Sequence, residues 1–98
     1  MSYFVTVTFD LNNEDSTTYT KVDNALESIG LSKRVKGSTG KYHDLPANTY
    51  VGEFEGESTG KVRDDVCAQV QETLKNEGVK ATAFITVGSG WAWGIRYT

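Results

Sequence analysis

The 98-residue sequence has very few of the residues that cross-link a small protein or bind a metal. It contains one cysteine, Cys67, and one histidine, His43. A lone cysteine excludes an internal disulfide, and it indicates a reducing compartment and a core held by packing alone. Because zinc sites need clustered cysteine and histidine, we expect no metal site, and no motif indicates a cofactor.

Long hydrophobic runs and an excess of basic charge are also missing. The apolar stretches are interrupted every second or third residue, far short of the roughly 20 apolar residues that cross a bilayer. The chain begins in a strand-like pattern without a basic leader, so we expect a cytoplasmic protein with no membrane partner. The net charge of -3 argues against a general polyanion binder, but it leaves room for a local basic surface.

The spacing of the apolar residues predicts alternating strands and helices in a single domain, residues 1–98. Strands show an apolar residue at every second position, and helices show one at every third or fourth. The predicted strands are residues 3–10, ending at a break at 12–15, then 31–36, 49–54 and 79–87, and the predicted helices are 17–29 and a second one from about 58 to 78. Residues 41–45 either pair back on 31–36 or continue as an irregular edge.

This order of elements predicts an α+β fold, a ferredoxin-like βαββαβ two-layer sandwich. Right-handed crossovers place both helices on one face of a four-stranded antiparallel sheet. The aromatic tail, residues 91–97, is a candidate for one further C-terminal strand.

The sheet face away from the helices is where we expect partners to bind. If Tyr3 and its alternate neighbours face the helices, Phe4 and Asp10 lie on this open face, and Phe84 joins them from the last strand. Exposed aromatic rings on a sheet can stack RNA bases, but exposed apolar patches more often mark interfaces. We therefore favour packing under the tail or a second subunit. The predicted interface residues are Phe4, Phe84, Trp91 and Trp93.

The densest positive charge in this acidic chain lies in residues 33–41. Lys33, Arg34 and Lys36 lie in one run, and Lys41 follows a glycine turn. These four residues are candidate phosphate contacts for RNA. The alternative is a charged edge strand that prevents edge-to-edge aggregation.

Two residues are candidates for catalysis. Asp10 ends the first strand, where it would present a carboxylate to water or a metal, although an aspartate there more commonly makes a turn. His43 would act as a general base only if the fold brings it to a scissile phosphate.

The segment Gly30-Leu31-Ser32-Lys33-Arg34-Val35, followed by a glycine turn and Tyr42-His43-Asp44-Leu45-Pro46 with a tyrosine at 50, resembles the GhoS family of endoribonuclease antitoxins. The likeness covers roughly the first half of the chain. That family is similar in fold to the CRISPR-associated second integration protein, a ferredoxin-like dimer with an aspartate ending its first strand and an extra C-terminal strand. The resemblance implies an RNA-binding or RNA-cleaving protein, with Asp10, Arg34 and the basic strand as its functional residues.

Two functions follow from these observations. The first is a GhoS-like RNA-binding protein or endoribonuclease, the antitoxin of a toxin-antitoxin system, with single-stranded RNA or mRNA as its partner. The alternative is a non-enzymatic module that forms a homodimer through its open sheet face and aromatic tail.

Overall fold

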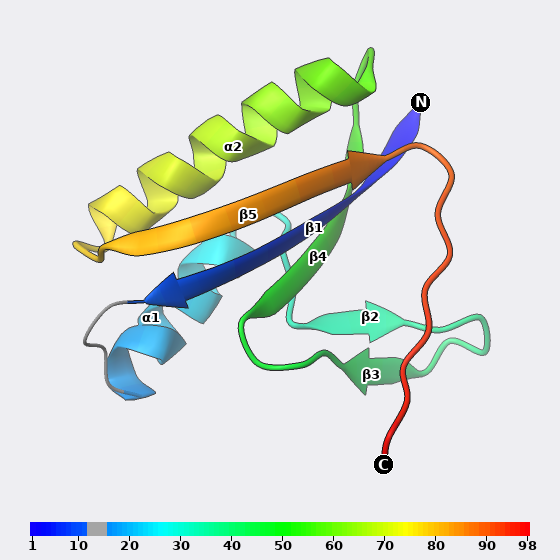
Figure 1. The fold of residues 1–98 in the computed structure, drawn as a ribbon, viewed down its shortest axis with the longest axis horizontal. Coiled ribbons are helices and arrows are strands. Elements are labelled where there is room, and N and C mark those ends of the chain that lie inside the picture. The colour runs from blue at the N-terminus through cyan, green and yellow to red at the C-terminus, as the bar shows by residue number, and fades with distance from the viewer. Residues whose placement is uncertain (12–15) are drawn as a thin grey trace.

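Five strands and two helices make up the part of the chain that the structure describes (Figure 1). The structure is a computed structural model, and it describes residues 1–11 and 16–98, with side chains for 1–11 and 18–98. The predicted break at 12–15 lies outside the described residues. The elements are β1 (Ser2–Leu11), α1 (Ser16–Glu27), β2 (Arg34–Lys36), β3 (Tyr42–Asp44), β4 (Thr49–Glu55), α2 (Thr59–Asn76) and β5 (Ala81–Gly88).

β1 is the centre of a three-stranded antiparallel sheet with the order β4-β1-β5. Val7 of β1 lies opposite Tyr50 of β4 on one side and Ile85 of β5 on the other. Because side chains alternate along a strand, this register puts all three residues on the same face. The same alternation puts Phe4 and Asp10 on the other face.

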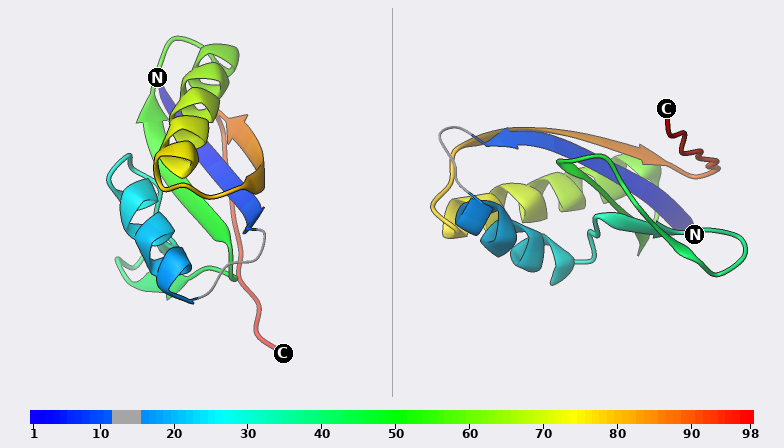
Figure 2. Two further views of the ribbon diagram at one scale, coloured as in Figure 1. Left: turned by 90° about the vertical axis from the view of Figure 1, so that its left-hand side faces the viewer. Right: turned by 90° about the horizontal axis from the view of Figure 1, so that it is seen from below.

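Both helices cover one face of this sheet, as predicted (Figure 2). The hydroxyl of Ser58 caps α2 by accepting the Lys61 amide, and Gly30, with a φ of 97°, follows the end of α1. Neither helix combines the length and the apolar character needed to cross a membrane. Most of the buried side chains form one cluster, which includes Tyr3, Val5, Val7 and Phe9 of β1, Val22 and Leu26 of α1, and Val62, Val66, Val70 and Leu74 of α2.

The predicted four-stranded sheet is replaced by three strands and a separate two-stranded hairpin, β2 and β3. Of the predicted strand 31–36, only Ser32 pairs with β4. Its amide donates to the Val51 carbonyl at 2.8 Å, and its carbonyl accepts from the Val51 amide at 2.9 Å. Beyond this bridge the chain pairs with β3 instead, and the Leu45 amide donates to the Lys33 carbonyl at 2.8 Å. The hairpin satisfies its own backbone hydrogen bonds, so the ladder with β4 stops after one residue.

The predicted C-terminal strand is not formed, because residues 91–98 have no regular secondary structure. The tail instead leaves the end of β5 and passes the β2–β3 hairpin on the side away from the helices (Figures 1 and 2). It is held there by side-chain packing: the rings of Trp91 and Phe4 stack with centroids 5.3 Å apart and planes 22° from parallel.

Candidate nucleic-acid interface

The outer face of the β2–β3 hairpin carries two cations around an exposed aromatic ring. Arg34 and Lys36 are two residues apart on β2, so they share a face, and Tyr42 lies directly opposite Lys36 on β3. The Arg34 guanidinium carbon is 5.1 Å from the centroid of the Tyr42 ring, and the Lys36 amine is 6.0 Å from it. Tyr42 is 55% exposed. Cations beside an accessible ring combine phosphate contact with base stacking, which is the usual chemistry of single-strand binding.

Lys33 is directed elsewhere and makes a structural contact. Its amine lies 3.4 Å from a carboxylate oxygen of Asp23 on α1, and the same carboxylate accepts a hydrogen bond from the hydroxyl of Tyr50 on β4. Burial, reinforced by the Asp23 carboxylate, raises the pKa of Tyr50 well above its usual value. This cluster ties the start of the hairpin to α1 and β4. Of the four predicted phosphate contacts, Arg34, Lys36 and Lys41 therefore remain exposed at the hairpin surface.

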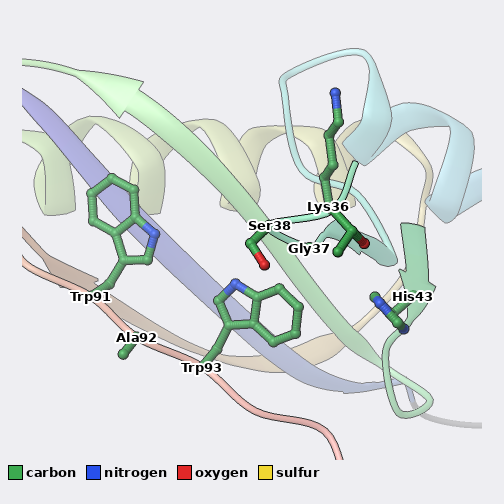
Figure 3. A pocket seen from close by; sticks show the side chains of 8 residues that line it. Lys36, Gly37, Ser38, His43, Trp91, Ala92 and Trp93 are labelled. Carbon is green, nitrogen blue, oxygen red and sulfur yellow. The ribbon is translucent and has the colours of Figure 1, made fainter. Parts of the chain in front are cut away.

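A hollow of about 530 Å³ lies between the hairpin and the C-terminal tail. We call it the tail hollow; it is lined by residues 36–39 of the hairpin turn, His43 and residues 91–93. The indoles of Trp91 and Trp93 project from the tail, and His43 lies beside Trp93 (Figure 3), with ring centroids 6.2 Å apart at 62°. The two tryptophans are 39% and 41% exposed, so both rings are accessible.

Asp10 lies at a second hollow, at the far end of the open face. This strand-end hollow has a volume of about 340 Å³, and Asp10, Asn48, Thr82 and Phe84 are among the residues that line it. His43 belongs to the tail hollow, so the fold does not bring the two predicted catalytic residues into one site. Asp10 and His43 are therefore not placed to share one proton-transfer step.

Three of the four predicted interface residues lie together, and Phe84 lies apart from them. Phe4 stacks on Trp91 of its own chain, and Trp93 lies beside His43. Phe84 is left 66% exposed on β5, outside the area that the tail covers. The tail therefore contacts the open face at Phe4, and the face remains accessible around Phe84.

Tyr42 was not among the residues predicted for the outer face of the hairpin. The necessary signal was present, because a turn over 37–41 pairs Lys36 with the residue that follows Lys41. The position of Trp91 and Trp93 beside the hairpin could not be predicted in the same way, because an irregular tail has no periodic pattern.

No protein-family model matches this chain, and no curated protein sequence matches it.

Proposed function

We propose that this chain is a single-stranded RNA-binding protein that contacts RNA through the outer face of its β2–β3 hairpin. The observation that carries the proposal is the pair of cations, Arg34 at 5.1 Å and Lys36 at 6.0 Å from the centroid of the exposed Tyr42 ring. Residues 33–44 contain four basic residues and one acidic residue in a chain whose net charge is -3. Such local positive charge is needed to hold a phosphate backbone when the overall field is repulsive.

The arrangement of the strands supports a ferredoxin-like fold, as in the family that residues 30–50 resemble. The order β4-β1-β5 is that of three strands of a ferredoxin-like sheet, and the Ser32 bridge to Val51 marks the place of the fourth. We propose that the hairpin is this fourth strand, bent away from the sheet after one pair. The bend exposes Arg34 and Lys36 beyond the sheet edge, where a strand of RNA can reach them.

Binding without cleavage fits the geometry better than an endoribonuclease does. Asp10 and His43 lie at different hollows, and only His43 is near the hairpin. Fragmentation of RNA by the purified protein, abolished by Asp10→Asn or His43→Gln, would show instead that the chain is an enzyme.

A salt series on binding of a labelled oligoribonucleotide tests the proposal. Affinity should fall steeply with salt, and Arg34→Ala should lower the slope of log K against log salt by about 0.7, the value for one lost contact to a single strand. Lys33→Ala is the matched control: it removes the same charge from the neighbouring residue, but that amine is engaged with Asp23. It should therefore change the slope much less.

Equal effects of Arg34→Ala and Lys33→Ala would refute the assignment of the outer face. Undetectable binding at low salt would refute RNA binding altogether.

Self-association is a second candidate function, and one observation favours it. β5 is an edge strand of eight residues, Ala81–Gly88, without a charge or a proline, and it presents Phe84 at 66% exposure. Natural edge strands usually carry charges or prolines that prevent pairing. Sedimentation velocity at rising protein concentration tests this candidate, which a strictly monomeric protein would rule out.

A further inference from the structure

We propose that the tail hollow is a binding site for an unstacked nucleobase, formed by the two tail tryptophans and the hairpin turn. This inference rests on the proposed RNA binding and specifies where a base of the bound strand is held. The volume of about 530 Å³ falls in the range typical of small-molecule sites.

The walls of the hollow have the chemistry that a base requires. Bases of single strands stack on accessible aromatic faces, and tryptophan offers the largest one. Trp93 is 41% exposed, and the imidazole of His43 packs edge-on against its indole with ring centroids 6.2 Å apart, which fixes the indole and leaves its exposed part for a base. The hydroxyls of Ser38 and Thr39, which also line the hollow, supply donors and acceptors for the edge of a base.

The tail is held in position for this role before any ligand binds. Trp91 stacks on Phe4 of β1 at 5.3 Å, and this contact anchors the tail two residues before Trp93. The turn has no side chain to obstruct the hollow at Gly37, where an added Cβ would lie 3.3 Å from the Nε2 atom of His43. A ring that is fixed in advance loses little entropy on binding.

The two faces of the hairpin suit different parts of a nucleotide, the phosphate and the base. Val35 and His43 are register partners on the inner face, and Arg34, Lys36 and Tyr42 lie on the outer one. Figure 3 shows the Lys36 side chain directed away from the two indoles, although its residue lines the hollow. A strand that follows the hairpin edge can therefore place phosphates against the outer cations while one base enters the hollow. The described residues that line the hollow include Lys36 but no carboxylate, which suits an anionic strand that places an uncharged base there.

Intrinsic fluorescence reports this site directly, because Trp91 and Trp93 are the only two tryptophans in the sequence. The protein is titrated with a short oligouridylate and with an abasic strand of the same length and charge. We expect the oligouridylate to change the tryptophan emission and to bind more tightly than the abasic strand, by about 5- to 150-fold for each base that stacks on Trp93 or Tyr42.

Variants then assign the effect to Trp93, with affinity measured on labelled strands. Trp93→Ala should weaken oligouridylate binding by about 5- to 150-fold and leave abasic binding unchanged, which also shows that the hairpin is intact. Trp93→Phe should recover most of the affinity, because it restores an aromatic face. Tyr97→Ala is the matched control, since Tyr97 is an aromatic residue of the same tail, 79% exposed, that does not line the hollow.

The outcomes separate this inference from the proposed function. Equal affinity for both strands with unchanged emission would overturn the base site and leave the phosphate contacts of the hairpin standing. Loss of affinity in Tyr97→Ala equal to that in Trp93→Ala would also overturn it. Failure of both strands to bind would refute the proposed function, and the base site with it.

Discussion

Gly52 in β4 is the position where the smallest change should have the largest effect on this fold. The carbonyl of Gly30, just before the chain enters the hairpin, lies against the backbone of Gly52. A Cβ built at Gly52 would lie 2.2 Å from the Gly30 oxygen and 2.9 Å from a ring carbon of Phe54. Gly52→Ala must therefore push two backbone segments apart, or distort β4.

The size of this effect follows from the nature of the obstruction. An ordinary contact between a Cβ and an oxygen is well above 3 Å, so the shift needed is on the order of 1 Å in backbone that is itself hydrogen-bonded at Ser32. Overpacking of this kind costs about 1–3 kcal/mol. In a domain of this size each kcal/mol lowers the melting temperature by roughly 4–8 °C.

Thermal and urea unfolding of Gly52→Ala and Gly88→Ala test the reasoning. Gly88 is also a strand glycine, paired with Phe4, but an added Cβ there meets no atom within 4 Å. Gly88→Ala should be neutral or stabilising by up to about 1 kcal/mol, because it restricts the unfolded chain. Gly52→Ala should also weaken RNA binding, since the displaced Gly30 leads into the hairpin. Equal melting temperatures of the two variants would refute the argument.

Two further changes test the Tyr50 cluster and the β5 edge. Burial and Asp23 raise the pKa of Tyr50 in the folded protein, so the tyrosine hydroxyl ionises at lower pH in the unfolded chain. The stability that the protonated hydroxyl contributes is therefore complete below about pH 10, and it is lost as the pH rises above that value. Tyr50→Phe should therefore reduce the fall in the urea midpoint between pH 8 and pH 11, and equal falls in both proteins would contradict this. If β5 mediates self-association, Phe84→Glu should shift the sedimentation coefficient of the dimer to that of a monomer, and an unchanged dimer would exclude this surface.

Much of the fold was predictable from local pattern alone. The alternation of residues 3–10 indicated the buried and open faces of β1, and the four-residue spacing of Val62, Val66, Val70 and Leu74 predicted the buried side of α2. These patterns depend on the geometry of neighbouring residues in one strand or helix, so a short stretch of sequence contains the whole signal. The close backbone approach at Gly52 was also predictable, because a glycine inside a strand pattern is otherwise unfavourable.

The composition of the candidate site was decided by tertiary structure. Lys33 and Arg34 are adjacent in the sequence, yet one pairs with Asp23 and the other lies beside Tyr42. Which cation is available depends on α1 and β3, which the run of basic residues does not describe. Similarly, the stacking of Trp91 on Phe4 joins residues from opposite ends of the chain. Local spacing of apolar residues was enough to show which side chains could face a core and which could face water. Which of these side chains meet depends on the tertiary structure, because contacts between distant segments form only when the packed sheet, hairpin and tail are in place.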